Sequence, residues 1–235
     1  MKKWTYLILF FLFIISCTSE STLYDVVIKN GIIYDGTGDM SYEGDMAIKG
    51  DKIAYIGKNK NLNGKKIINA EGKAVSPGFI NMLSWGYNSL LKDGRSLSDL
   101  KQGVTLEVFG EGISPGPKGV PGEKKYISFS KSMDSLVKKG VSTNIASFIG
   151  AATIRINTIG YENRVATNEE LDKMRISIEK AMKEGAMGIG SSLIYAPGDY
   201  ADTNELIELS KVASKYNGMY ISHMRNEDNK VLEAL

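Results

Sequence analysis

The sequence contains few of the residues that usually mark a disulfide scaffold, a nucleic-acid surface or a metal centre. Its one cysteine, Cys17, allows no internal disulfide. The net charge is only +2 and the basic residues are scattered, so nothing indicates nucleic-acid binding. One histidine in 235 residues, His223, is few for a metalloenzyme. The composition, 43% hydrophobic and 24% charged, is that of a globular protein of one to two domains.

The amino terminus has the pattern of an export signal. Lys2 and Lys3 precede an apolar run over residues 4–15, which is too short to span a membrane and has the length of a signal-peptide core. The sequence IISC, ending at Cys17, resembles the bacterial lipobox, where the chain is cleaved before the cysteine and the cysteine is lipidated. The resemblance implies a membrane-anchored lipoprotein of the bacterial cell envelope, facing the periplasm or the exterior. The alternative is an ordinary signal peptide with an incidental cysteine.

The sequence divides into four stretches. Residues 1–17 are the predicted signal and 18–23 a tether. Residues 24–75 contain apolar runs separated by three hairpin-type turn signals, which predicts a β-sandwich or a piece of one. These signals are Asn30-Gly31, Gly50-Asp51 and Glu71-Gly72.

Residues 76–235 alternate strand-like and helical patterns, as in an α/β barrel. The predicted strands cover residues 79–83, 104–109, 143–149, 186–189 and 219–224. A complete barrel takes about 250 residues, so this stretch holds about five strand–helix units. We therefore predict an α/β fold, an incomplete TIM-like (β/α) barrel preceded by a small β-sandwich unit, and a chain that is a fragment.

The stretch 185–225 predicts the site most directly. Asp202 or Thr203 is expected to cap a helix, with Glu205 closing the capping box from Asp202. The strand that follows ends at His223. In folds built from parallel strand–helix units, ligands and metals collect at the carboxyl ends of the strands.

The same stretch resembles the D-aminoacylase branch of the amidohydrolase superfamily. GIGSSLIYAPGDYADTNELIELSK and SHMR match that branch's pattern GLIYPPGxYADTxELIxLAK and its SHxR motif. The opening YDVVIKNG, GDKIAYIG and AVSPGFIN is similar too. The resemblance implies a zinc-dependent hydrolase of N-acyl-(D-)amino acids, with one zinc ion and with His223 as a zinc ligand.

The resemblance also shows which ligands are missing. The histidine pair expected after the first barrel strand falls on Leu83 and Trp85, and its neighbouring aspartate on Asn81. Neither leucine nor tryptophan can bind zinc. A further histidine, after strand three, falls on Ala151. Half of a two-metal site is therefore predicted to be absent.

A replacement ligand is expected from the second strand, where the branch uses a cysteine. Alternation along residues 104–111 places Glu107, Phe109 and Glu111 towards the barrel interior. Glu111, at the carboxyl end, is the candidate zinc ligand, and the alternative is a solvated loop residue. Glu107 lies deeper, where a buried carboxylate needs a partner.

Six residues are candidates for the rim of the site. Tyr195 and Tyr200 lie on the loop after the fourth strand, and Tyr195 matches a family position near the substrate. Arg155 and Arg225 are candidate substrate-binding residues, since guanidinium groups bind carboxylates bidentately, and ordinary salt bridges are the alternative. Trp85 and Phe109 would form an apolar wall or part of the core.

The remaining catalytic parts that the resemblance implies are expected beyond Leu235, so this chain is predicted to be inactive alone. They are a second zinc-binding histidine and the aspartate that transfers the proton. Two alternatives stay open. One is a non-catalytic, lipid-anchored binding protein or pseudoenzyme that has lost the histidine pair; the other is the product of a truncated reading frame.

Overall fold

The computed structural model describes residues 23–58 and 61–235, so the predicted signal and Cys17 lie outside the described residues. The chain divides into two compact units, one ending at Pro77 and one beginning at Gly78. No helix within the described ranges has both the length and the apolar character required to cross a membrane.

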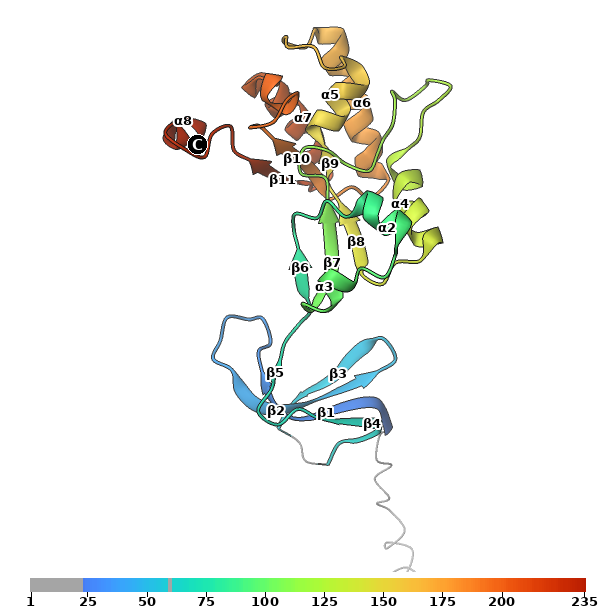
Figure 1. Ribbon diagram of the computed structural model, residues 1–235, viewed down its shortest axis with the longest axis vertical. Helices are drawn as coiled ribbons and strands as arrows, with labels where there is room; N and C mark the ends of the chain where they lie inside the picture. The colour runs from blue at the N-terminus through green and yellow to red at the C-terminus, as the bar shows by residue number, and fades with distance from the viewer. Residues whose placement is uncertain (1–22, 59–60) are drawn as a thin grey trace, which may run out of the picture. The chain divides into compact units, whose positions relative to one another are not determined.

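The first unit is a single mixed sheet of five strands (Figure 1). Its central strand, β1, pairs antiparallel with β2 and parallel with β4 and β5, and β3 pairs antiparallel with β2. Val27, Ala47 and Leu62 form its small core. The strands are β1 (Leu23–Ile33), β2 (Tyr42–Lys49), β3 (Lys52–Gly57), β4 (Asn63–Asn69) and β5 (Ala74–Val75).

Only one of the three predicted hairpins is present. Gly50-Asp51 joins β2 to β3 as expected. The prediction for Asn30-Gly31 is wrong, because β1 runs through it with a register shift between Ile28 and Gly31. Asn30 has a φ of 59° and its amide donates to Asp45 at 2.9 Å, so this pair forms a bulge inside a central strand.

The third hairpin prediction, at Glu71-Gly72, is also wrong. The turn is followed by β5, which pairs with β1 and continues the course of β4 along the same edge. Gly31 is required here, since a Cβ at this position would lie 2.5 Å from Val75 Cγ2. Turn residues indicate where a strand is interrupted, but the pairing partner of the next segment depends on the rest of the sheet.

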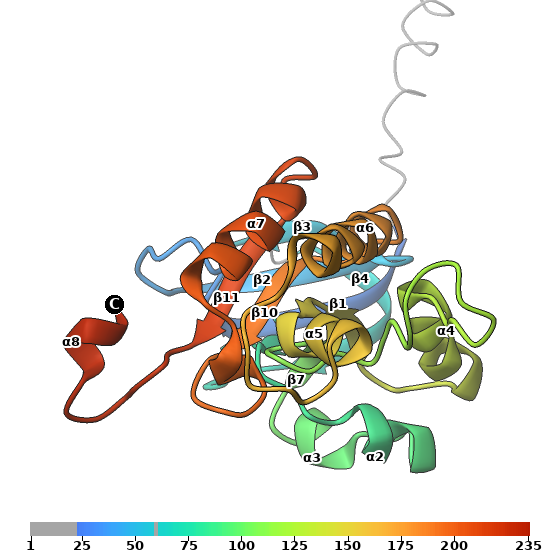
Figure 2. The same cartoon turned by 90° about the horizontal axis from the view of Figure 1, so that it is seen from above.

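The second unit carries parallel strands in chain order, with helices between them (Figures 1 and 2). One sheet is β6-β7-β8 and the other β9-β10-β11. The predicted third strand divides at Phe148 into β8, which pairs with β7, and β9, which pairs with β10. The strands are β6 (Phe79–Asn81), β7 (Val104–Phe109), β8 (Asn144–Ser147), β9 (Ile149–Gly150), β10 (Gly188–Ser192) and β11 (Met219–His223).

These strands form part of an α/β barrel, as predicted, and the described residues do not close it. The helices are α2 (Tyr87–Lys92), α3 (Leu97–Leu100), α4 (Phe129–Lys139), α5 (Ala151–Thr158), α6 (Asn168–Lys183), η1 (Gly198–Tyr200), α7 (Thr203–Ser214) and α8 (Val231–Ala234). The main core lies between α5, α6, α7 and β10, and includes Ile154, Met174, Ile178, Ile189 and Leu209. The sequence patterns missed α2 and α5.

Helix α6 begins with a capping box formed by Thr167 and Glu170. Thr167 Oγ1 accepts a hydrogen bond from the Glu170 amide at 3.2 Å, and Glu170 Oε2 accepts one from the Thr167 amide at 2.8 Å. This reciprocal pair satisfies two amide groups that the first helical turn leaves without partners. Arg164 also donates to the Glu170 carboxylate, and these hydrogen bonds lower its pKa to about 2.

Thr167→Ala is expected to lower the free energy of unfolding by about 1 kcal/mol, because it removes the helix cap.

Glu170 contributes stability that is present above its unfolded pKa of about 4.3 and is lost as the pH falls toward 2. Urea unfolding at pH 7 and pH 3 measures both effects. If Glu170→Gln keeps the same acid-dependent loss of stability as the wild type, this assignment is wrong.

Candidate functional site

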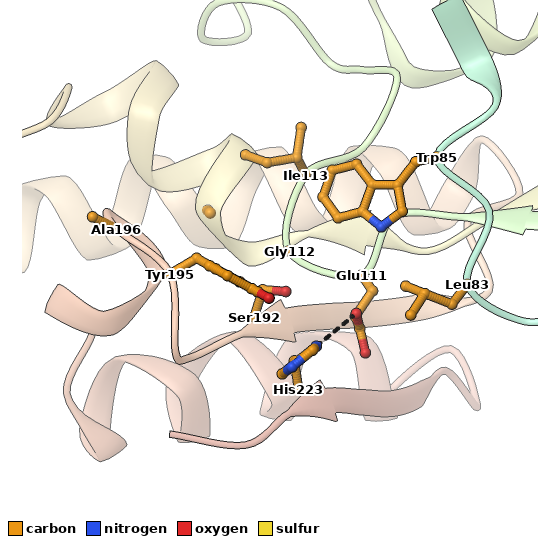
Figure 3. A pocket seen from close by; sticks show the side chains of 10 residues that line it. Leu83, Trp85, Glu111, Gly112, Ile113, Ser192, Tyr195, Ala196 and His223 are labelled. Carbon is orange, nitrogen blue, oxygen red and sulfur yellow. Dashed lines mark hydrogen bonds and ion pairs between the residues drawn. The ribbon is translucent and has the colours of Figure 1, made fainter. Parts of the chain in front are cut away.

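A pocket of about 390 Å³ lies in the second unit, at the carboxyl ends of its strands (Figure 3). Its lining is mostly apolar, with Glu111 and His223 as its two ionisable groups besides Tyr195. A mostly apolar concavity with a few convergent polar groups is the usual form of a small-molecule site. The lining residues are Leu83, Trp85, Glu111, Gly112, Ile113, Ala152, Ser192, Tyr195, Ala196 and His223.

Glu111 reaches the pocket from the loop after β7. Gly110 has a φ of 97°, and a Cβ there would lie 2.1 Å from the Phe148 carbonyl oxygen. Glycine at this position therefore lets the chain turn tightly against the neighbouring strand. The Glu111 side chain is 13% exposed.

His223 ends β11, and its imidazole lies beside the Glu111 carboxylate in the pocket (Figure 3). Its Nδ1 lies 3.4 Å from Glu111 Oε2, and its Nε2 lies 3.0 Å from Glu227 Oε1. The Tyr195 ring packs edge-on against the imidazole, with ring centres 5.3 Å apart. The contact between Nδ1 and Glu111 Oε2 is a long hydrogen bond, and the Glu227 carboxylate lies beside Nε2 as an ion-pair partner.

The Nδ1–Oε2 distance suits a metal better than a direct hydrogen bond. A charge-assisted N–H···O⁻ bond is about 2.7–2.9 Å long. Two ligand atoms bound tetrahedrally to zinc at about 2.0–2.2 Å lie about 3.4 Å apart. Imidazole nitrogen and carboxylate oxygen are both zinc ligands, so this pair fits as part of a zinc site. Within the described residues there is no cluster of three or more His, Cys, Asp or Glu side chains that could hold a metal.

Leu83 and Trp85, which stand where the histidine pair was expected, line the same pocket. Asn81, at the neighbouring aspartate position, lies outside the lining. Its side-chain amide donates to Asp99 at 3.1 Å. The pocket wall opposite His223 is therefore apolar. Leu83 and Trp85, at the two expected histidine positions, lie around the candidate metal ligands (Figure 3).

The structure does not bring Arg155 to the pocket, so its predicted substrate-binding role is not supported. Arg155 is fully buried on α5, and its Nη1 lies 2.5 Å from Glu205 Oε2 on α7. Its other terminal nitrogen donates to the backbone carbonyls of Glu162 and Arg164. The salt bridge, which was the alternative, is the interaction present. It also corrects the prediction for Glu205, whose carboxylate turns into the core and does not close the capping box on Asp202.

Arg225 is also absent from the lining. Its guanidinium donates to the backbone carbonyls of Asp199 and Ala201, at 3.3 and 2.6 Å, and so holds the loop that includes η1. Tyr200 lies on this loop but outside the lining, whereas Tyr195 lines the pocket. Of the predicted substrate-binding residues, Tyr195 is thus the one that the pocket contains.

The predicted direction of Phe109 is wrong. It packs with Leu90 of α2 and Leu136 of α4, on the helix side of β7. Glu107 lies two residues earlier, is 2% exposed, and accepts hydrogen bonds from the hydroxyls of Ser84, Ser96 and Thr143 at 2.5–2.9 Å. These hydroxyls are the partners that a buried carboxylate needs, and Glu107 lies outside the pocket lining.

Comparison with known proteins agrees with the fold. The D-aminoacylase of Alcaligenes xylosoxydans xylosoxydans is 31% identical over 230 residues, which are 92% of this chain and 48% of that protein. An N-acyl-D-glutamate deacylase of the same organism is 28% identical over 225 residues. A crystal structure of D-aminoacylase superposes with a TM-score of 0.81 at 30% identity, over 90% of this chain and 47% of that one. Over about nine-tenths of its length the chain is therefore similar to D-aminoacylases.

The chain spans about half the length of the curated relatives it matches. The N-acyl-D-glutamate deacylase from Bordetella bronchiseptica, solved with zinc and a phosphonate inhibitor, gives a TM-score of 0.81 at 27% identity. No family model matches the chain.

Two polar residues at the site, Glu227 and Ser192, were not predicted from the sequence. Glu227 lies four residues after His223, and that spacing was the available signal. Ser192 lines the pocket from the end of β10. A serine in an apolar strand carries no signal of its own, because its function depends on what the neighbouring strands place beside it.

Proposed function

We propose that this chain forms part of a zinc amidohydrolase that cleaves N-acyl-(D-)amino acids. The observation that carries the proposal is the Glu111–His223 pair, whose Oε2 and Nδ1 atoms are 3.4 Å apart in an apolar pocket. Zinc would be held by these two atoms, and when bound it polarises the amide carbonyl and activates water.

The chain's own residues would prepare this site in three ways. The Glu227 carboxylate, 3.0 Å from Nε2, would help to orient the imidazole so that Nδ1 is directed to the metal. The edge-on Tyr195 ring restricts rotation of the imidazole. Leu83, Trp85 and Ile113 would hold the apolar part of an N-acyl amino acid and exclude water from it.

The alternative, a non-catalytic binding protein, rests on the apolar pair Leu83 and Trp85 and on the two-residue ligand set. A catalytic zinc usually has three protein ligands, so the chain alone is expected to show little or no turnover. In either function the pocket is the binding site for an N-acyl amino acid.

The two functions differ in zinc uptake. Equilibrium dialysis of the chain at pH 7.5 should give about one bound Zn²⁺ per chain. N-acetyl-D-leucine should then bind more tightly than its L enantiomer, as measured by calorimetry. Ligand binding without zinc uptake would favour the binding protein, and binding of neither would contradict both functions.

We also propose that the protein is a lipoprotein of the bacterial cell envelope, held to a membrane through Cys17. The support is the sequence alone, since the positively charged start, the apolar run and the cysteine lie outside the described residues. Incorporation of labelled palmitate into the chain in a bacterial host tests this anchoring, and a chain without label would contradict it.

A further inference from the structure

Ser192 is a buried hydroxyl without a partner. The residue is 6% exposed, and its Oγ has no hydrogen-bond partner among the described residues. A buried polar group normally has a partner because desolvation without one is costly. Ser192 lines the pocket, so a bound ligand can supply the missing partner.

The position of Ser192 in the sheet places it beside the candidate metal ligand. Ser192 of β10 and His223 of β11 are register partners in the parallel pair. Their side chains therefore leave the same face of adjacent strands, which lie about 4.8 Å apart. Both line the pocket (Figure 3).

Its neighbour Ser191 shows that an unpartnered hydroxyl is not a general feature of this strand. Ser191 points to the opposite face, as alternation requires. Its Oγ lies 2.6 Å from the Tyr220 hydroxyl and 2.8 Å from Ser222 Oγ. Both serines are buried, yet the hydrogen bonds of Ser191 are made within the protein.

The pocket chemistry indicates what Ser192 would bind. None of the ten lining residues is lysine or arginine, so the lining offers no fixed positive charge to a carboxylate. A neutral carbonyl oxygen needs one hydrogen-bond donor, and a serine hydroxyl can donate. Tyr195 and Trp85 also carry donors, but they are 57% and 62% exposed and can hydrogen-bond water.

We propose that Ser192 Oγ donates a hydrogen bond to the acyl carbonyl oxygen of an N-acyl amino acid bound beside His223. This inference rests on the proposed function and adds the residue that recognises the acyl group. Ser192 is then a substrate-binding residue that takes no part in binding the metal.

A double-mutant cycle between protein and ligand tests the hydrogen bond. Wild type and Ser192→Ala are titrated by calorimetry, in the presence of Zn²⁺, with N-acetyl-D-leucine and with its N-thioacetyl analogue. A thiocarbonyl sulfur is a weak acceptor, so it removes the same hydrogen bond from the ligand side. Ser192→Ala is expected to bind the oxygen ligand about tenfold more weakly. The two proteins should bind the sulfur ligand equally.

The melting temperatures of the variants distinguish a ligand-binding role of Ser192 from a structural one. Because Ser192 Oγ has no partner, Ser192→Ala should keep or raise the melting temperature of the chain. Ser191→Ala, the matched control, should lower the melting temperature and leave the affinity for N-acetyl-D-leucine unchanged. If the wild type binds N-acetyl-D-leucine and Ser192→Ala binds it just as tightly, the inference about Ser192 is overturned. A folded wild type that binds neither ligand overturns the proposed function itself.

Discussion

Replacing Arg155 by methionine is expected to lower the free energy of unfolding by about 3–5 kcal/mol. Arg155 is fully buried, and its ion pair with Glu205, which is 2% exposed, has an N–O distance of 2.5 Å. Removing the guanidinium leaves an ionised carboxylate in the core between α5 and α7. It also removes the donor to the carbonyls of Glu162 and Arg164. Urea unfolding followed by circular dichroism measures the loss.

The pH dependence of Arg155→Met identifies the cause of the loss. Burial already raises the pKa of Glu205, and the positive charge of Arg155 acts against that rise. In the variant the folded-state pKa rises further, so the folded state holds the proton more strongly than the unfolded state. Stability then falls as the pH rises above the unfolded pKa of about 4.3. Arg155→Met should therefore be closest to wild-type stability in acid.

Two control variants separate a lost charge partner from a lost volume. The double variant Arg155→Met/Glu205→Leu removes both charges and should recover most of the stability. Glu208→Gln breaks the partly exposed pair with Arg175 between α6 and α7, 2.9 Å apart, and should cost about 0–1 kcal/mol. If Arg155→Met is no more destabilising than Glu208→Gln, the buried pair does not hold α5 to α7.

This pair also shows where sequence reasoning ends. The cap of α7 was predicted at Asp202 or Thr203, and Asp202 provides it, since its Oδ1 accepts a hydrogen bond from the Glu205 amide at 2.7 Å. The same local rule assigned the Glu205 side chain to the cap. Arg155 lies 50 residues earlier in the chain and takes that carboxylate into the core. A local pattern predicts a backbone conformation well and a side chain's partner poorly when a buried charge competes for it.

The strands of the second unit were predictable for the same local reason. Apolar runs between capped helices gave all five strand regions, and β7 was predicted with its observed bounds, Val104–Phe109. The direction of side chains along β7 was not predicted. Phe109 packs on the helices because Leu90 and Leu136 complete a core there. Alternation fixes which residues share a face, but the packing partners decide which face is inside.

The site was predictable where a family motif covered it. The SHMR motif indicated His223, and the expected replacement for the branch's cysteine ligand after the second strand indicated Glu111. His223 Nδ1 and Glu111 Oε2 are 3.4 Å apart, although the two residues are 112 positions apart in the sequence. Ser192 and Glu227 needed the structure, because an unpartnered hydroxyl and a carboxylate beside the second imidazole nitrogen depend on how neighbouring elements are placed.

His223→Ala is expected to remove tight zinc binding, with a loss of affinity of at least about a hundredfold. The variant loses the single nitrogen ligand and leaves Glu111 as a lone carboxylate in the pocket. One carboxylate is a poor site for zinc, which prefers a tetrahedral set including nitrogen or sulfur. Competition with a chromophoric chelator measures the affinity. In the wild type, the imidazole Cε1–H resonance of the one histidine should shift on zinc addition.

Two carboxylate variants show whether the loss is specific to the pair. Glu111→Gln should also weaken zinc binding strongly, because it removes the ligand 3.4 Å from Nδ1. Glu169→Gln removes one negative charge from an exposed position in the first turn of α6 and should leave the affinity unchanged. If His223→Ala binds zinc as tightly as Glu169→Gln, the metal is held elsewhere. The pocket would then contain an imidazole paired only with carboxylates, and the amidohydrolase function would lose its chemical basis in this chain.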